Sequence, residues 1–596
     1  MANKRGIFSL ISLLTYKKPK EVKSFYIPET EDEEKKDPIN QQEEKRVKTI
    51  KQPTKRPTPV SEIKKSSKRD KRNNGNSQNE DGIDKLSKGY DENLEFIKNS
   101  FNEKENKDII IREFTIAGEH KAFLAFIDGM TDRITINDFI LRPLLSKSKL
   151  DTEDSCSLDK IIKGVIETNQ TLKVTDPNEV IFEILNGNTC LYVDGCDYYI
   201  SSETKGYEKR SVTTPQTEGV VRGSQEGFTE NLRTNVTLVR KIIRNKDLST
   251  EFLKIGKRNH NQCAVMYIKG LTNPAIVEEV KRRIKGLSTD FIAGSGILEQ
   301  FIEENPMSII PTILTTERPD RVAANIIEGR VAIIADGSPF VLVVPVSISS
   351  IFQTPEDTNL RWQYGALLRI IRVFAVFIAT FTPGLYVALT NFHREMIPTD
   401  LLIAIAKARE NVPFPTIIEV LLMELSFELI REAGIRIPGI IGNTIGIIGA
   451  LILGQAAVQA NLVSPVLIII VALTGLGNFA IPDFGMAFAA RIIRIGFIIL
   501  GALLGFYGIS LGIVAAVALL SHTKSFGVPF LTFYGPKVNN SNDLIIRMPV
   551  WKQQFRPDEI NPLDITRQKK ISRTWTREKP ASDKKEEQGE EENEDD

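Results

Sequence analysis

Four glutamates interrupt an apolar stretch of the chain, "IIEVLLMELSFELIREAG" at 417–434. A carboxylate in the middle of a bilayer costs roughly 2.5–3.5 kcal/mol on insertion scales, so such a group faces protein or water rather than lipid. With about 100° of rotation per helical residue, Glu424, Glu428 and Glu432 fall on one face and Glu419 points elsewhere. A stripe of this kind is typical either of a cation path or of a buried ion-pair cluster.

Both interpretations of the stripe remain open from the sequence. Arg431 and Arg436 lie close to Glu428 and Glu432, and this spacing favours a structural ion-pair cluster at one end of the helix. Glu424 has no basic residue within a turn, which favours an ion path with Glu424 at its deepest point. The path is predicted to contain four side chains: Glu424, Glu428, Gln455 and Gln459.

The sequence contains no constellation typical of catalysis. Its four histidines are scattered, none of its four cysteines belongs to a CxxC pair, and no G-x-x-x-x-G-K-[ST] loop occurs. We therefore predict that the chain is not an enzyme and carries no catalytic, cofactor or metal site. The cysteines are interpreted as buried, reduced thiols.

Charged residues cluster in two further stretches, "PQTEGVVRGSQEGFTEN" (215–231) and "TERPDR" (316–321). An anion-binding turn at Arg222 is one interpretation of the first stretch, and a polar, ion-paired linker is the other. The second stretch is expected to cap a helix that begins at Pro319 and to form ion pairs across a subdomain surface. We predict a domain-coupling or subunit-coupling role for Arg222, Glu226, Glu230, Glu317 and Arg318.

An internal repeat organises the middle of the chain. "PNEVIFEILNGNTCLYVDGCDYYI" (177–200) matches "PDRVAANIIEGRVAIIADGSPFVL" (319–342), and "AFIDGMT" (125–131) matches "MYIKGLT" (266–272). Each copy contains an Asp-Gly pair between apolar runs, which is a strong hairpin signal. The repeat predicts two similar α/β subdomains.

Apolar segments from 366 onwards predict an all-α membrane domain of five or six segments. Residues 366–390, 438–463 and 464–481 are each predicted spans, and 485–521 is either one bent helix or a hairpin. Gly442, Gly446, Ala450 and Gly454 fall at every fourth residue, and the three glycines are predicted to allow close helix packing. The fold class is therefore a multi-domain membrane protein with duplicated α/β subdomains before a transmembrane helical domain.

Composition sets the boundaries between these parts, although the whole chain has a net charge of only +1. The charged ends lack the apolar content that a core requires. The predicted parts are a disordered N-terminal extension (1–95), subdomain 1 (96–205), a connector (206–262), subdomain 2 (263–360), the transmembrane domain (364–522) and a charged cytoplasmic tail (523–596).

Several of these stretches together resemble the A subunit of the GerA-type spore germinant receptors. They are "PQTEGVVRGSQEGFTENLRTNV", "TERPDRVAANIIEGRVAIIADGSPFVLVVP", "VPFPTIIEVLLMELSFELIREAGIRIP" and "GQAAVQANLVSP". The family's "RGP" turn stands here as Arg222-Gly223-Ser224. The resemblance covers roughly residues 110–535.

The resemblance implies a function and a set of partners. It implies the inner membrane of a bacterial spore, a transporter-like B subunit that binds the nutrient, a C-subunit lipoprotein, and a ring of A subunits around a nutrient-gated cation channel. The soluble part and the tail are then expected to face the spore core, and no nucleic acid is expected as a partner. The alternatives are an A-like subunit associated with the dipicolinate-release channel and a component of a secondary transporter, which usually has inverted membrane repeats.

Overall fold

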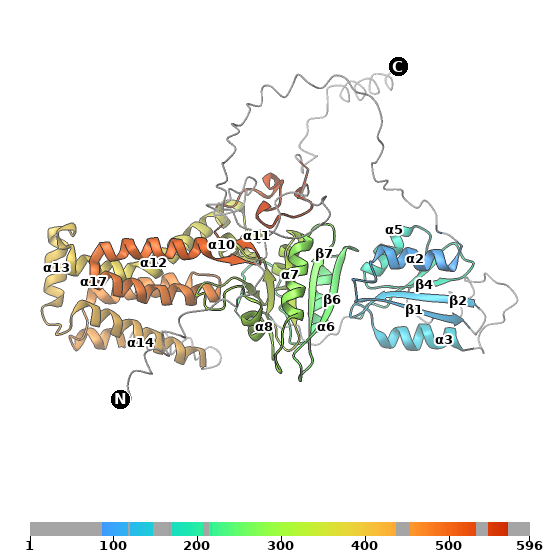
Figure 1. Ribbon diagram of the computed structural model, residues 1–596, viewed down its shortest axis with the longest axis horizontal. Helices are drawn as coiled ribbons and strands as arrows, with labels where there is room; N and C mark the ends of the chain where they lie inside the picture. Colours follow the sequence, from blue (N-terminus) through green and yellow to red (C-terminus); the bar gives the residue numbers. More distant parts are fainter. Residues whose placement is uncertain are drawn as a thin grey trace, which may run out of the picture.

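The computed structural model describes residues 86, 88–116, 120–146, 166, 170–206, 214–215, 217–436, 453–531 and 546–569. Three units follow one another along the long axis of the molecule in Figure 1. A sheet containing β1 and β2 lies at one end, a sheet containing β6 and β7 lies in the middle, and a bundle of long helices lies at the other end.

Subdomain 1 is a five-stranded sheet with helices on both faces. Its elements are α2 (Tyr90–Ser100), β1 (Ile109–Ile116), β2 (His120–Ile127), η3 (Thr135–Leu141), α3 (Arg142–Leu145), β3 (Thr171–Val174), α5 (Pro177–Leu185), β4 (Thr189–Val193) and β5 (Tyr199–Ser202). The strand order is β1-β2-β4-β5-β3, and each neighbouring pair is antiparallel.

Subdomain 2 repeats this plan. Its elements are α6 (Leu232–Ile242), β6 (Leu248–Ile255), β7 (Asn261–Ile268), α7 (Pro274–Lys285), α8 (Ser295–Ile302), β8 (Leu314–Thr316), α9 (Pro319–Ile327), β9 (Val331–Ala335) and β10 (Val341–Val344). The strand order β6-β7-β9-β10-β8 matches that of subdomain 1. The predicted duplication is confirmed, and the glycines of both Asp-Gly hairpins, Gly195 and Gly337, have the expected positive φ.

The central strands are apolar throughout because both faces of each sheet are covered. In β7, Cys263, Val265 and Tyr267 pack in one core with α7 and α8. The alternate residues Ala264 and Met266 pack in another core with α6 and α9. This follows from the two-residue period of a strand.

One sequence prediction about this region is narrowed and another needs correction. The described strand pairs are all antiparallel, so the predicted α/β class is, more narrowly, an antiparallel sheet with helices packed on its faces. The connector predicted over 206–262 contains α6 and β6, which belong to the second sheet and its cover. Subdomain 2 therefore begins well before residue 263. The repeated motifs did not reveal β6, because the first of them in this subdomain begins at residue 266, within β7.

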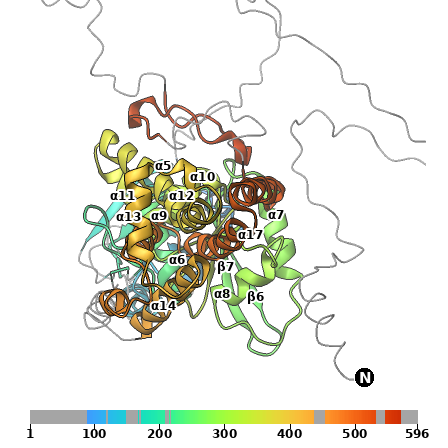
Figure 2. The same cartoon turned by 90° about the vertical axis from the view of Figure 1, so that its left-hand side faces the viewer.

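The helical region begins with two short helices and one long helix. Its elements are α10 (Ile348–Phe352), α11 (Pro355–Asn359), α12 (Trp362–Phe392), η5 (Arg394–Met396), α13 (Thr399–Arg409), α14 (Thr416–Arg436), α16 (Pro465–Phe479) and α17 (Phe484–His522). Figure 2 looks along this region from its far end, where α12, α14 and α17 run toward the sheets.

Helix α17 is a hairpin of two arms rather than a straight rod. Gly505 has φ 60° and ψ −138°, which breaks the helix. After the break, the backbone of Gly508 lies against Leu500, and Gly512 lies against Phe497. Gly501 lies so close to Gly384 of α12 that a Cβ there would be 2.5 Å from the Gly384 carbonyl oxygen. The hairpin alternative of the sequence prediction is confirmed.

Two described helices are long and apolar enough to cross a membrane, α12 and α17. The two arms of α17 have lengths of ~31 Å and ~26 Å at 1.5 Å per residue, close to the thickness of a bilayer core. Helix α16 has 15 residues, and α14 carries the glutamates. Most of the predicted span 438–463 lies outside the described residues, so five or six segments remains a prediction.

Subdomain 2 and the helical region share one core. Ala379 of α12 and Met486, Ala487 and Ala490 of α17 pack in the same cluster as Leu314 and other residues of the second sheet and its helices. After α17 the chain forms a small hairpin, β11 (Lys524–Ser525) and β12 (Val528–Pro529). Residues 546–569, with η6 (Val550–Lys552) and η7 (Asp558–Ile560), then lie against subdomain 2 and the start of α12.

Candidate functional site

A buried charged contact joins Glu424 of α14 to Arg494 of α17. The Arg494 Nη2 lies 2.9 Å from the Glu424 Oε2, and the two side chains are 5% and 8% exposed. An ion pair so well shielded is stable only when each charge keeps its partner, because an unpaired charge there would be costly. Helix α14 is therefore fixed to the first arm of α17 at this point.

Glu428, one turn further along α14, extends the contact into a four-charge cluster. Its carboxylate accepts from Arg491 at 2.9 Å and from Arg494 at 3.4 Å. The two glutamates and two arginines balance in formal charge. Three buried atoms of the cluster, Glu424 Oε1, Arg494 Nε and Arg491 Nη2, have no hydrogen-bond partner in the described part of the chain. The cluster therefore has unused capacity for water, an ion or another chain.

The sequence offers Glu424 no basic residue within a turn, but the structure pairs it with Arg494. Its partner comes from α17, seventy positions later in the sequence, where a local search cannot find it. The alternative prediction, an ion-pair cluster of Glu428 and Glu432 with Arg431 and Arg436, stays a prediction, because the side chain of Arg436 lies outside the described residues. The guanidinium of Arg431 lies 5.7 Å from the ring centre of Phe479, and Glu432 is exposed.

Glu419 points away from the cluster, as predicted, and has a structural contact of its own. It is 1% exposed, accepts from the Arg409 Nη2 at 3.1 Å and accepts from the backbone N–H of Ser464 at 3.2 Å. The first contact holds α13, and the second lies at the N-terminus of α16. Glu419 therefore positions two neighbouring helices.

The other predicted members of the ion path are not joined to this cluster. Gln455 and Gln459 are exposed, and no described contact links them to Glu424. Gly454 faces α16, with Ile468 at an ordinary 3.8 Å from a Cβ placed there. Gly442 and Gly446 lie outside the described residues, so their packing role stays a prediction.

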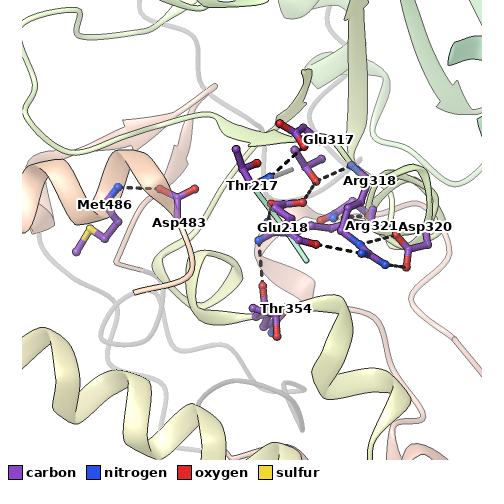
Figure 3. A network of polar contacts seen from close by, with 12 residues as sticks. Thr217, Glu218, Glu317, Arg318, Asp320, Arg321, Thr354, Asp483 and Met486 are labelled. Atoms are coloured by element: carbon purple, nitrogen blue, oxygen red, sulfur yellow. Dashed lines mark hydrogen bonds and ion pairs between the residues drawn. The ribbon is translucent and has the colours of Figure 1, made fainter. Parts of the chain in front are cut away.

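A second polar network lies where subdomain 2 meets the helical region (Figure 3). Arg318 is fully buried, pairs with Asp320 at 2.8 Å and donates to the carbonyls of Glu218 and Ser224. Arg321 pairs with Glu218 at 2.5 Å. These contacts hold the segment 217–226 on the N-terminal end of α9.

The predicted coupling residues are divided between this network and the surface. Glu317 accepts from the backbone N–H of Thr217, and Arg318 holds the network described above. Glu226 pairs with Lys241 of α6 at 2.6 Å. The backbone carbonyl of Glu230 accepts a hydrogen bond from the backbone N–H of Gly337 at 2.8 Å. Arg222 is exposed.

Sequence reasoning missed Glu218 and Arg321. The excess of charge around Pro319 was the only sequence signal for this pair. It could not identify Glu218, which lies about a hundred positions before Arg321.

The network continues into the first long helix. Arg321 donates to the carbonyl of Gln353 at 2.9 Å. Next to it, Arg372 of α12 donates to the Thr354 hydroxyl at 2.9 Å and to the Asp357 carboxylate at 2.8 Å. Asp357 is fully buried and also accepts from Arg369 at 3.0 Å. A path of buried charged groups therefore runs from the 217–226 segment through α9 to α12.

Further carboxyl groups gather at this junction. Burial raises the pKa of Glu299 to about 7, and the nearby charges of Glu303 and Asp483 add to this effect. Asp483 accepts from the backbone N–H of Met486 at the start of α17, and burial raises its pKa as well. The junction therefore contains a group, Glu299, that changes charge near neutral pH.

A buried ion pair fixes subdomain 1 to subdomain 2. Arg240 of α6 donates to both carboxylate oxygens of Asp108, at 2.6 Å and 2.8 Å, and the side chains are 1% and 2% exposed. Nearby, Arg233 pairs with Asp128. The backbone of Gly129 packs against the hydroxyl of Thr237 and leaves no room for a Cβ. The subdomains are therefore oriented by α6.

A comparison with protein-family models gives a match to the Bacillus/Clostridium GerA spore germination protein family, over residues 95–559. The chain belongs to the GerA family. The match covers the strands of both sheet subdomains, the junction network and the helical region of this GerA-family protein.

Individual relatives agree with the GerA assignment. Spore germination protein KA of Bacillus subtilis (strain 168) is 40% identical over 471 residues, which cover 78% of this chain and 86% of the relative. Spore germination protein A1 of the same organism is 38% identical over 459 residues, covering 77% and 93%. Spore germination protein GerLA of Bacillus cereus is 36% identical over 461 residues, covering 77% and 93%.

A solved structure is also similar to part of the chain, the N-terminal domain of the A subunit of the Bacillus megaterium spore germinant receptor GerK3. It is 33% identical, covers 44% of this chain and 96% of its own, and aligns with a TM-score of 0.35. A TM-score that low supports no conclusion about the fold.

Proposed function

We propose that this GerA-family protein is the A subunit of a nutrient germinant receptor in the spore inner membrane. Family membership and relatives named as spore germination proteins support a role in germination. The same family suggests the partners, a transporter-like B subunit that binds the nutrient and a C-subunit lipoprotein. In this proposal the chain crosses the membrane several times, and its sheet subdomains and its C-terminal tail lie on the cytoplasmic side, in the spore core.

Copies of the chain assemble into a ring around a cation path, and α14 contributes the charged groups. The observation that carries this part is the cluster of Glu424 and Glu428 with Arg491 and Arg494 among apolar helices. A ring of carboxylates attracts monovalent cations and repels anions. While Arg494 neutralises Glu424, the ring has no free carboxylate charge to attract cations. The paired arrangement of Glu424 and Arg494 therefore corresponds to a closed path.

Opening requires Glu424 to leave Arg494, and the junction network provides a route by which a signal could cause this. Segment 217–226 and α9 contact the residues just before α12, and α12 packs along α17. A movement of the sheet subdomains therefore acts on the helix that carries Arg494. A nutrient bound by a partner shifts the equilibrium only by its preference for the open state, a few kcal/mol for a useful response.

The first experiment is removal of the chain from spores that otherwise respond to nutrients. The proposal predicts loss of nutrient-triggered release of monovalent cations for a subset of nutrients. If cations leave normally and dipicolinate release fails instead, the chain is the A-like subunit associated with the dipicolinate channel. If only uptake of a solute changes, the chain is a component of a secondary transporter.

Self-association is tested separately by cross-linking in intact membranes with the partners present. Oligomers of this chain are expected, because one copy cannot surround a water-filled path with its own few helices. Recovery of monomers alone, at a receptor level equal to that of functional spores, would contradict the ring.

A further inference from the structure

The two sheet subdomains differ in the path of the chain after their last strand. In subdomain 1 the chain continues from β5 directly across the turn after β2. The backbone N–H of Asp132 donates to the Thr204 carbonyl at 2.8 Å, and the N–H of Gly206 donates to the Met130 carbonyl at 3.2 Å. Lys205, between them, forms an isolated bridge with Thr131. Residues 204–206 thus complete this edge of subdomain 1.

In subdomain 2 the corresponding residues leave the sheet. The N–H of Val346 donates to the Ser525 hydroxyl, and the N–H of Ile348 donates to the Phe530 carbonyl, both at 2.9 Å. The chain turns there toward α10 and the helical region. The edge that residues 204–206 cover in subdomain 1 is therefore not covered by the equivalent part of the second repeat.

Residues from the far end of the chain occupy that edge instead. The N–H of Leu563 donates to the Leu271 carbonyl at 2.9 Å, as Gly206 does to Met130 in subdomain 1. The Asn273 side-chain amide donates to the Asn561 carbonyl at 3.3 Å, in the place of the Asp132–Thr204 bond. Pro562 lies 3.3 Å from a Cβ placed on Gly329, the repeat partner of Gly187. Residues 561–563 reproduce the contacts of 204–206.

Side chains anchor this segment at both ends. Ile560 is 1% exposed and belongs to the core of β7, α7 and α8. Glu559 accepts from the Ser347 hydroxyl at 2.7 Å and lies 3.5 Å from Arg330, with only 3% of its side chain exposed. At the other end, Arg547 donates to the carbonyls of Leu360 and Thr358, just before α12.

We infer that residues 546–569 form a releasable latch that completes subdomain 2 and ties it to the first long helix. The latch binds to subdomain 2 through three contacts. The Glu559 carboxylate lies against Arg330, Ile560 packs in the core, and the N–H of Leu563 donates to the Leu271 carbonyl. The role of the latch in germination rests on the proposed function: the latch carries movement of subdomain 2 to α12, and release of the latch uncouples them.

Docking is tested on the full chain in isolated membranes by limited trypsin digestion. Ile560→Asp removes the buried anchor, and Ile565→Asp is its matched control, because Ile565 on the same segment is 42% exposed. We expect cleavage after Lys552 and Arg567 to be at least tenfold faster in Ile560→Asp and unchanged in Ile565→Asp. Equal cleavage of the two variants would overturn the latch.

A thiol probe distinguishes release of the latch from unfolding of the sheet. Cys263 of β7 is fully buried, so labelling of Cys263 in Ile560→Asp would show that the segment is an inseparable part of the core, and the inference would fail. Glu559→Gln keeps the side-chain size and is expected to accelerate cleavage to a smaller extent, with Cys263 still protected. If trypsin cleaves Glu559→Gln no faster than the parent, the contact between Glu559 and Arg330 does not hold the latch in place.

Coupling is tested in spores at equal receptor levels. Ile560→Asp is expected to slow nutrient-triggered cation release several-fold relative to Ile565→Asp. If the segment becomes sensitive to trypsin and release stays at the parental rate, the latch docks but does not couple. If the parental chain supports no nutrient-triggered release at all, the proposed function fails, while the digestion result still decides whether the latch exists.

Discussion

Replacing Arg240 by alanine should destabilise the contact between the two sheet subdomains. Arg240 makes five hydrogen bonds, to Asp108, Asn106, Asn245 and Leu248, and almost none of its side chain is exposed. Removing one partner of a buried ion pair costs roughly 3–5 kcal/mol, because the other charge stays buried without compensation. At roughly 2–4 °C per kcal/mol for a unit of this size, the unfolding midpoint should fall by roughly 6–20 °C.

The assay is thiol labelling of the detergent-solubilised full chain during a temperature ramp, with mass spectrometry to locate each label. Cys190 reports on subdomain 1 and Cys263 on subdomain 2, and both are fully buried. Burial raises the pKa of Cys263 to about 12, so the folded thiol does not react at pH 8.

Arg258→Ala is the matched control, because its ion pair with Asp290 is largely exposed. An exposed pair contributes less than about 1 kcal/mol. The double variant Arg240→Ala/Asp108→Ala should cost less than the sum of the single variants. If Arg240→Ala and the Arg258→Ala control have the same unfolding midpoint, the ion pair of Arg240 does not orient the subdomains.

Three further variants test other parts of the structure. The pKa of Glu299 is about 7 when folded and ordinarily 4.5, so the folded state holds the proton more tightly and stability falls as pH rises through this window. Glu299→Gln should remove a cost on the order of 2–3 kcal/mol in unfolding experiments at pH 8 and little at pH 4, and equal effects would refute the assignment. Glu419→Gln weakens the hold on Arg409 and should lower the amount of receptor in membranes, by immunoblot, rather than the release rate per receptor. Asp357→Ala leaves Arg369 buried without its carboxylate and should lower the unfolding free energy by roughly 3–5 kcal/mol, and a change under about 1 kcal/mol would count against the buried pair.

The sheet subdomains were largely predictable because their sequence signals are local. The Asp-Gly hairpins and the matching apolar runs repeat at a constant spacing, which predicted the duplication that the strand orders confirm. Strand β6 was missed, although only residues 256–260 separate it from its partner β7, because neither repeated motif includes it. The hairpin signals indicated antiparallel pairs, but they did not indicate the order of the strands in each sheet.

The charge cluster was only half predictable. The stripe on α14 follows from helical geometry, so the sequence brings Glu424 and Glu428 to one face. Their partners, Arg491 and Arg494, lie on the first arm of α17, which meets α14 only in the folded chain. The C-terminal segment was unpredictable in the same way, because Leu563 and Leu271 are adjacent only in the folded chain.

The central claim, a cation path controlled by the Glu424–Arg494 pair, is tested most directly by cation release from spores with equal receptor levels. Glu424→Gln keeps the side-chain size and removes the charge, so nutrient-triggered release should slow, whereas Glu432→Gln on an exposed position of the same helix should behave like the parent. Arg494→Gln frees the carboxylate and should allow release without nutrient. Parental release rates in both Glu424→Gln and Arg494→Gln would contradict the account, because the cluster would then be structural and the path would lie elsewhere.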